Sequence, residues 1–292
     1  MNIVGAADRD LSKARQIAIS HGLPTDFDKP SDMLCATKPD LVDIIAPPHA
    51  HLAIIRSAAE FGINVICQKP FCGNLEEAQE AVALAEQAGI QLAIHENFRF
   101  QPWYREIKKL LAAGAVGQVY TMHFQMRPGD GKGEEAYLDR QPYFREMRRF
   151  MVFETAVHHF DVFQFLLGRP KAVYADLRRL NPVISGEDAG YIVLHFDNAV
   201  RAIYDGNRLV DHNAEDRRLT MGEMLIEGAA GVLRLDGNGN IFLRKAGHND
   251  EVQHTYEWQN TGFGGDCVYA FQAHVLSHLK KNTPLENSAK DY

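Results

Sequence analysis

The sequence lacks the features that would mark several common classes of protein. Lysine and arginine (31) are outnumbered by aspartate and glutamate (38), which gives a net charge of −7. A nucleic-acid surface needs a clustered basic excess, and the densest basic stretch, Arg145 to Arg149, is interrupted by Glu146 and Met147. No signal peptide is visible at the N-terminus, and no apolar run approaches the roughly 20 residues of a membrane span. We expect neither a nucleic-acid nor a membrane partner.

Cysteine is also scarce, and its spacing matches no metal motif. The four cysteines are Cys35, Cys67, Cys72 and Cys267, and none forms a metal-type CxxC pair. Unpaired thiols are typical of a reducing compartment, so the prediction is a cytoplasmic protein.

The phosphate-binding turn G-x-G-x-x-G is missing too, and GFGGD (262–266) is interpreted as a loop.

The first hundred residues alternate apolar runs with helical stretches. Strands are predicted at 2–8, 41–47, 63–70 and 90–97, and helices at 11–21, 51–61 and 75–88. Asp10 is the expected N-cap of the first helix, and Gly22 the residue that ends it. Continuous apolar strands separated by helices indicate a doubly wound, Rossmann-like parallel sheet of the α/β class.

The pattern changes after Asn97. Helices are predicted at 103–113 and 153–167, and a strand at 119–127. Seven further strands with alternating polarity follow between 172 and 258, joined by Gly, Asn and Asp turns. This half is predicted to be α+β, a largely antiparallel sheet with one open face. The expected domains are therefore 1–98 and 99–292.

Four stretches carry a family resemblance in the order that the family has them. They are APPHAHLAII (46–55), CQKPFCGNLEEAQEA (67–81), HENFRFQPWYREIKKLL (95–111) and FETAVHHFDVFQFLLG (153–168). The chain resembles the glucose–fructose oxidoreductase / inositol dehydrogenase / MocA (Gfo/Idh/MocA) family. This resemblance implies a nicotinamide-dependent oxidoreductase acting on a sugar, polyol or cyclitol. Against the family pattern, the first strand-turn-helix and the final helix are absent, so we expect a trimmed chain.

The resemblance also implies where a dinucleotide binds. Asp8 ends what corresponds to the second strand, where an acid bonds the ribose hydroxyls, and a carboxylate there favours NAD. The adjacent Arg9 could instead pair with the 2′-phosphate of NADP. The predicted cofactor-binding residues are Asp8, Arg9, Pro47, Pro48, His51, Gln68, Lys69, Asn97 and Arg99. For Asn97 and Arg99, packing at the domain junction is an equal alternative, with Arg99 in a salt bridge.

The predicted catalytic residues are Lys69, Glu154 and His158. Lys69 follows Gln68, which replaces the family's Glu, at the carboxyl end of a parallel strand. Glu154 replaces the family's Asp, and its spacing from His158 places both on one helix face. We expect His158 to be the general base and Lys69 to stabilise the alkoxide. Glu154 would orient His158 or bond the substrate.

A metal site at Glu154, His158 and Asp161 is the alternative for this helix, but hydride transfer in the family needs no metal, so none is predicted. His159 is interpreted as a packed histidine.

Substrate contacts are expected from both halves of the chain. Besides Lys69, Glu154 and His158, the predicted substrate-binding residues are Arg127, Tyr143 and Asp205. Arg208 and His212 lie in the same loop region as Asp205. Solvent-exposed turn residues are the alternative for each of these loop positions.

The open sheet face is a natural surface for a homodimer or homotetramer, as in the family. A rival hypothesis is a non-catalytic protein that binds a sugar-like ligand or a partner.

Overall fold

The computed structural model describes residues 2–292, which form two compact units. One unit comprises Met1–Glu96 together with Ala273–Tyr292, and the other comprises Asn97–Gln272. This division differs from the expected domains at two points. The break follows residue 96 rather than 98, and the final segment joins the first unit instead of the second.

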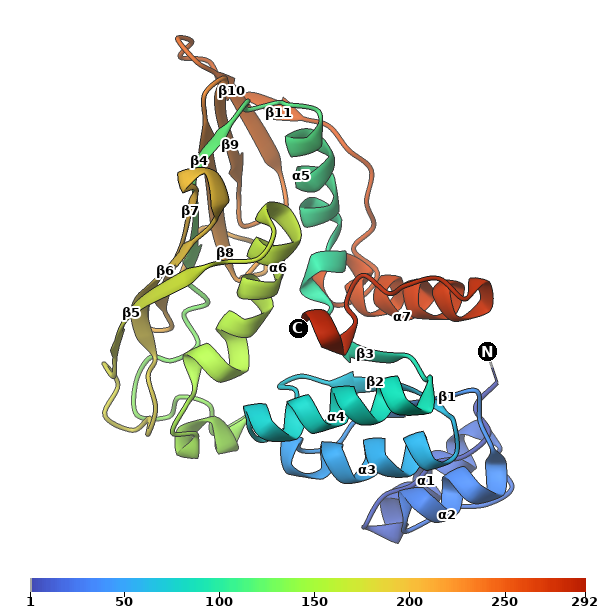
Figure 1. The fold of residues 1–292 in the computed structure, drawn as a ribbon. Helices are drawn as coiled ribbons and strands as arrows, with labels where there is room; N and C mark the ends of the chain where they lie inside the picture. Colours follow the sequence, from blue (N-terminus) through green and yellow to red (C-terminus); the bar gives the residue numbers. More distant parts are fainter. Residues whose placement is uncertain (1) are drawn as a thin grey trace. The chain divides into compact units, whose positions relative to one another are not determined.

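The first unit is built on a three-stranded parallel sheet in the order β1-β2-β3 (Figure 1). Its strands are β1 (Leu41–Ile44), β2 (Asn64–Gln68) and β3 (Leu92–His95), and its first four helices are α1 (Leu11–His21), α2 (Pro30–Thr37), α3 (Pro48–Glu60) and α4 (Leu75–Ala88). Buried side chains such as Ile55, Val65 and Ile94 form its core. The prediction of a Rossmann-like α/β unit is confirmed.

Local capping explains why α1 and α4 have the predicted bounds. The Asp10 side chain accepts a hydrogen bond from Ser12 N, and Asn74 does the same for Glu77 N. Gly22 and Gly89 end the two helices in the left-handed conformation that glycine adopts without strain. Helix α2, which begins at Pro30, was not predicted from the sequence.

The predicted strand at 2–8 is wrong. Within the described residues this segment makes only one isolated bridge, between Ala7 and Phe27. Ile3 and Val4 are exposed. An apolar run becomes a strand only where a neighbour pairs with its backbone.

The C-terminal segment covers the free edge of β3. Ser288 forms an antiparallel bridge with Ala93. Asn287 accepts from Ile94 N at 3.1 Å through its carbonyl, and Lys290 pairs with Glu86 at 2.8 Å. Edge strands need such protection, which explains why residues 273–292 belong to this unit.

The second unit contains an eight-stranded mixed sheet in the order β11-β10-β9-β8-β4-β7-β6-β5, in which only β4 and β7 pair in parallel. The strands are β4 (Val119–Met126), β5 (Ala172–Arg178), β6 (Ala189–His195), β7 (Arg201–Asn207), β8 (Gly222–Gly228), β9 (Gly231–Leu235), β10 (Ile241–Lys245) and β11 (Val252–His254). The expectation of a largely antiparallel sheet is confirmed.

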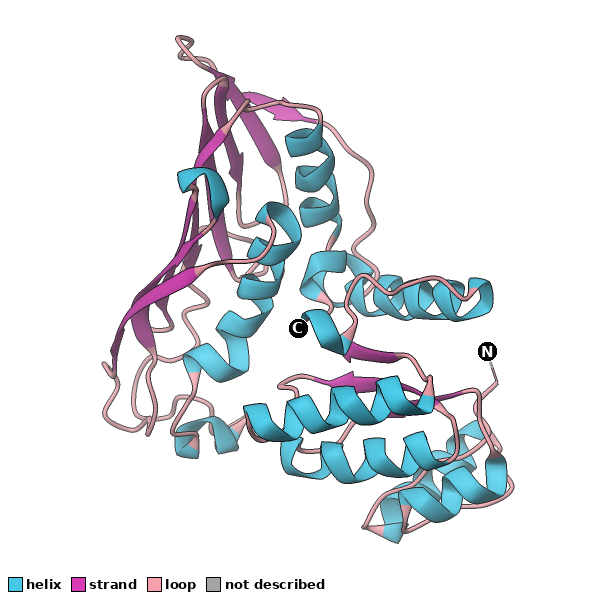
Figure 2. Ribbon diagram, viewed as in Figure 1, coloured by secondary structure: helices cyan, strands magenta, loops and turns pink. Residues whose placement is uncertain are grey.

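Helices α5 (Pro102–Ala112) and α6 (Val157–Leu167) lie on one side of this sheet (Figure 2). Their buried side chains, including Trp103 and Phe163, share one core with Phe124 and Tyr204 of the sheet. The predicted helix-covered face is therefore present. Coverage of the other face by a second copy of the chain stays a prediction.

The helix expected at 153–167 is instead two elements. Residues Met151–Ala156 form a π-helical turn, η3, and α6 begins only at Val157. Glu187 fixes the entry to η3, because its Oε1 accepts from Phe150 N and Val152 N, each at 3.0 Å. Gly206 packs against the first residue of η3. A Cβ at position 206 would come within 2.4 Å of Met151 Sδ, so only glycine leaves room for this turn. π-Helical turns frequently occur at functional sites.

The glycine-rich stretch 262–266 overlaps the start of the long helix α7 (Phe263–Lys281), which was not predicted from the sequence. Gly264, Gly265 and Asp266 have left-handed backbone angles, so the stretch is irregular, as a loop would be. A Cβ on Gly265 would approach Pro102 Cδ to 2.6 Å. Among residues 2–292, no helix combines the length and apolar character that crossing a membrane requires.

Candidate functional site

The carboxyl ends of the three parallel strands meet at one edge of the first unit. The registers Ile44↔Cys67 and Cys67↔Ile94 align the strand ends. Ligands bind at this edge in doubly wound sheets. The edge therefore brings together the turn after β1, the Gln68–Lys69 segment after β2 and the end of β3.

The Pro47–Pro48 turn after β1 is fixed by His51. This buried histidine donates from Nε2 to the Ala46 carbonyl at 2.7 Å. Burial is the main cause that lowers the pKa of His51, which favours a neutral ring. His51 therefore holds the turn in place, and its predicted contact with a cofactor would be made through that turn.

Gln68 and His95 form a cross-strand pair at the same edge. They are register partners, and the Gln68 amide is hydrogen-bonded to His95 Nδ1. The side-chain amide of Gln68 is thus already hydrogen-bonded to a residue of the neighbouring strand. Lys69 follows it, half-buried, and its peptide bond to Pro70 is cis.

The polar groups of this edge fit a dinucleotide. Asp8 lies outside the three strands, next to the isolated bridge between Ala7 and Phe27. Its exposed carboxylate accepts from Asp10 N at 2.8 Å through Oδ1, and its predicted contact with the ribose stays a prediction. Arg9 beside it is exposed. Asp8, the Pro47–Pro48 turn and Lys69 would hold NAD, whereas no G-x-G-x-x-G occurs in the sequence, so no residue is assigned to the pyrophosphate.

In the second unit, His158 has a defined ring environment. Its imidazole lies flat against Phe98, with ring centroids 4.0 Å apart and an interplanar angle of 7°. The side chain is largely buried, with 8% of the residue exposed. A fixed ring plane leaves the two ring nitrogens pointing in set directions, as a general base requires.

The neighbouring His159 has a packing role, as expected. It is fully buried and stacks on Phe124 at 4.0 Å. Burial, followed by the charge of His158, holds the pKa of His159 well below its usual value. A neutral ring in the core suits a structural residue.

Arg99 and Asp161 form a buried ion pair. Arg99 Nε donates to Asp161 Oδ2 at 2.7 Å, and Nη2 bonds the other carboxylate oxygen. Their side chains are 8% and 4% exposed. Arg99 thus makes the salt bridge of the alternative, and its predicted contact with the cofactor stays a prediction. In the described part of the chain, no three potential ligands converge on a metal position.

The other predicted junction residue, Asn97, donates from its amide to Cys267 Sγ at 3.3 Å. This contact joins the segment after β3 to the first turns of α7. It is a packing contact, so the cofactor-binding role predicted for Asn97 remains a proposal.

Glu154 lies in η3, so the α-helical spacing predicted for Glu154 and His158 does not apply. Its Oε2 accepts a hydrogen bond from Thr155 Oγ1 at 2.5 Å. Arg208 Nη1 is 3.8 Å from the same oxygen. Thr155 and Arg208 thus both contact the carboxylate, and neither contact was predicted from the sequence.

Asp205 and Arg127 lie on the face of the sheet opposite to η3 and α6. Side chains alternate along a strand: Tyr204 and Gly206 face the helices, and Asp205 faces away. Arg127 Nη2 pairs with Asp205 Oδ2 at 2.6 Å, and His123 Nε2 lies 3.8 Å from it. Burial lowers the pKa of His123, and Asp205 opposes that change.

This placement corrects the prediction that Asp205 and Arg127 bind substrate together with Glu154, because the sheet lies between them. Tyr143 is exposed and accepts a hydrogen bond from Gln141 Nε2 at 3.2 Å through its hydroxyl. Its predicted contact with the substrate stays a prediction.

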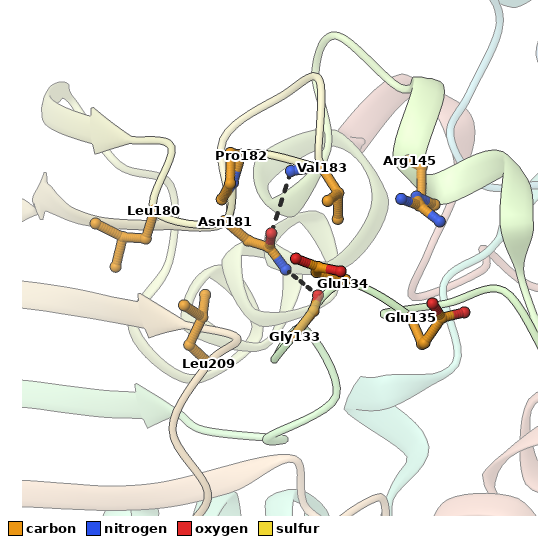
Figure 3. Close-up of a pocket in the computed structure, with 9 residues that line it drawn as sticks. All are labelled: Gly133, Glu134, Glu135, Arg145, Leu180, Asn181, Pro182, Val183 and Leu209. Carbon is orange, nitrogen blue, oxygen red and sulfur yellow. Dashed lines mark hydrogen bonds between the residues drawn. The ribbon is translucent and has the colours of Figure 1, made fainter.

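A pocket of about 530 Å³ in this unit contains none of the predicted residues (Figure 3). The buried Asn181 organises it, donating to the carbonyls of Gly131 and Gly133 at 2.8 Å and accepting from Val183 N at 3.1 Å. Glu134, Glu135 and Arg145 lie among its lining residues. No motif in the sequence marks this pocket, because it depends on loops far apart in the chain.

Comparison with known proteins gives concordant matches along the chain. The model described as "Oxidoreductase family, NAD-binding Rossmann fold" matches residues 1–96, and the model of the GFO/IDH/MocA C-terminal domain matches residues 104–234. A D-apiose dehydrogenase of Rhizobium rhizogenes is 30% identical over 99% of this chain and 83% of its own length. One of Paraburkholderia graminis is 31% identical over 82% of this chain and 62% of its own length.

A solved structure resembles the chain over nearly its whole length. It is an oxidoreductase from Agrobacterium radiobacter in complex with NAD+, L-tartaric acid and magnesium. Its TM-score is 0.88 at 26% identity, and the match covers 99% of this chain and 84% of that one.

Proposed function

Because the chain belongs to the Gfo/Idh/MocA family of NAD-dependent oxidoreductases, we propose that it transfers a hydride between NAD and a secondary alcohol carbon of a sugar or polyol. The observation that carries this proposal is the buried imidazole of His158, held flat against Phe98 in the helix that matches the family motif. The D-apiose dehydrogenases among the relatives support a sugar substrate.

Each residue has a separate chemical task in this proposal. NAD, when bound, supplies the hydride acceptor of the oxidation. His158 takes the proton of the substrate hydroxyl, since imidazole titrates near neutral pH. The ammonium group of Lys69 stabilises the oxygen as it becomes an alkoxide. Glu154, which Thr155 already contacts, accepts a hydrogen bond from a further hydroxyl of the substrate.

Asp8 supports a preference for NAD over NADP. A carboxylate that accepts from ribose hydroxyls repels a 2′-phosphate. Arg9 is exposed beside it and is the residue that could offset this repulsion. We propose that the repulsion by the Asp8 carboxylate outweighs the attraction by Arg9, so that the chain prefers NAD to NADP.

The experiment is a two-stage assay with the full chain. NADH and NADPH are titrated first, by nicotinamide fluorescence, and saturable binding with NADH preferred is expected. NAD+ is then mixed with D-apiose and a panel of sugars and polyols, and substrate-dependent formation of NADH is expected. Binding of NADH without turnover of any compound would contradict the proposal and favour a non-catalytic, ligand-binding protein.

A further inference from the structure

We infer that Arg208 and Thr155 form a hydrogen-bond relay that positions the Glu154 carboxylate to recognise a substrate hydroxyl other than the one oxidised. This inference rests on the proposed function of Glu154. Arg208 and Thr155 are positioning residues in it, since they act through Glu154.

Arg208 is anchored by groups other than Glu154. It is 2% exposed. Its Nη2 pairs with Asp130 Oδ2 at 2.8 Å, and its Nε donates to Tyr137 OH at 2.7 Å. These contacts fix the guanidinium plane through two of its nitrogens and leave Nη1 directed to Thr155.

Aromatic rings enclose the same guanidinium. Its central carbon lies 4.6 Å from the ring centroid of Phe150, 5.4 Å from that of Tyr137 and 5.5 Å from that of Phe144. Such faces attract a cation. Burial opposes the charge of Arg208, but Asp130, Tyr137 and Glu154 outweigh it, so the pKa of Arg208 is raised and the group stays cationic.

The relay runs through one hydroxyl group. Arg208 Nη1 donates to Thr155 Oγ1 at 2.6 Å, and Thr155 Oγ1 donates to Glu154 Oε2 at 2.5 Å. A hydroxyl has one proton and two lone pairs. Because arginine has no acceptor, its bond to Thr155 takes a lone pair, and the single proton of Thr155 is directed at Glu154. The direction of the relay is thereby determined.

The acceptor end of the relay lies in the π-helical turn η3. Thr155 is 1% exposed, and Glu154 precedes it in η3. A carboxylate that is bonded by a buried hydroxyl and faces a permanent cation is held as an acceptor. A polyol hydroxyl is the donor that such a group recognises. A site built to bond a hydroxyl discriminates strongly against an analogue without it.

The test compares Thr155→Val with a matched buried threonine. Val keeps the branched shape of Thr155 and removes the relay, so kcat/KM for the best substrate should fall by about 10- to 100-fold. KM should rise, and the Kd of NADH should be unchanged. Thr155→Ser, which keeps the hydroxyl, should restore most of the activity. Thr220→Val is the control: Thr220 is fully buried, and its hydroxyl donates to Gly222 O at 2.7 Å.

Deoxy analogues of the substrate distinguish a positioning role of Thr155 from a purely structural one. Loss of a structural contact would lower activity on the substrate and on its analogue alike. The wild type should discriminate against the analogue that lacks the hydroxyl bonded by Glu154, and Thr155→Val should lose most of that discrimination. Arg208→Lys, which keeps the charge but not the fork of donors, should change kcat/KM in the same direction. Equal discrimination in the wild type and Thr155→Val would overturn the inference.

Crystal structures of the wild type and Thr155→Val separate this inference from the proposed function. The Glu154 side chain should occupy one position in the wild type and several in the variant. That result is expected even if the wild type turns over no substrate, which would refute only the proposed function. An unchanged Glu154 in Thr155→Val would refute the relay regardless of activity.

Discussion

Replacing His158 with phenylalanine is expected to lower kcat by about 100- to 10,000-fold, the usual contribution of a general base. Phenylalanine preserves the flat packing against Phe98, where the ring centroids are 4.0 Å apart. It removes the ring nitrogen that we propose takes the hydroxyl proton. The Kd of NADH should not change, because His158 is not among the predicted cofactor-binding residues.

His159→Phe is the matched control, because it replaces the adjacent histidine by the same residue. His159 is fully buried and stacked on Phe124, so a phenyl ring keeps its packing. Steady-state kinetics should give a kcat close to that of the wild type. If both variants lose activity equally, the effect is one of core packing, and His158 is not the base.

Replacing Asp161 with alanine should lower the free energy of unfolding of the second unit by about 3–5 kcal/mol. The change leaves the buried guanidinium of Arg99 without its carboxylate, and both side chains are nearly inaccessible to water. Both tryptophans, Trp103 and Trp258, belong to this unit and pack against each other at 5.5 Å. Tryptophan fluorescence during urea unfolding therefore reports on this unit.

Two comparisons isolate the buried charge as the cause. Asp197→Ala removes the partner of Lys171 in an exposed pair, with side chains 69% and 67% exposed, and should cause no measurable loss. Arg99→Met combined with Asp161→Leu should recover much of the stability, because it removes both charges. A loss in Asp161→Ala no larger than in Asp197→Ala would show that the buried pair contributes little.

The elements that the sequence predicted well are those determined locally. Helices α1 and α4 depend on a capping side chain and a terminal glycine within their own segments. The alternating strands of the second sheet likewise carry their pattern within a few residues.

The features that the sequence did not reveal depend on distant partners. The π-helical turn depends on Glu187, more than thirty residues away in the chain, and on the absence of a side chain at Gly206. Arg208 reads as a loop residue until Asp130, Tyr137 and Thr155 surround it. The placement of residues 273–292 follows from the unpaired edge of β3.

The sequence did not predict which of the site residues of the second unit share one face of its sheet. The family motifs pointed to Glu154 and His158, which lie in consecutive elements of one unit. Asp205 and Arg127 were grouped with them because they follow strands, but the alternation of side chains along β7 places Asp205 on the other face. One residue of register decides which face a side chain occupies.

The most direct test of the central claim is isotope transfer. The full chain is incubated with NAD+ and the best sugar or polyol of the panel, labelled with deuterium at the carbinol carbon, and the NADH formed is analysed by mass spectrometry. Hydride transfer predicts one deuterium in each NADH, carried directly from the labelled carbon. NADH formed without deuterium, or no NADH from a folded chain that binds the cofactor, would contradict the account.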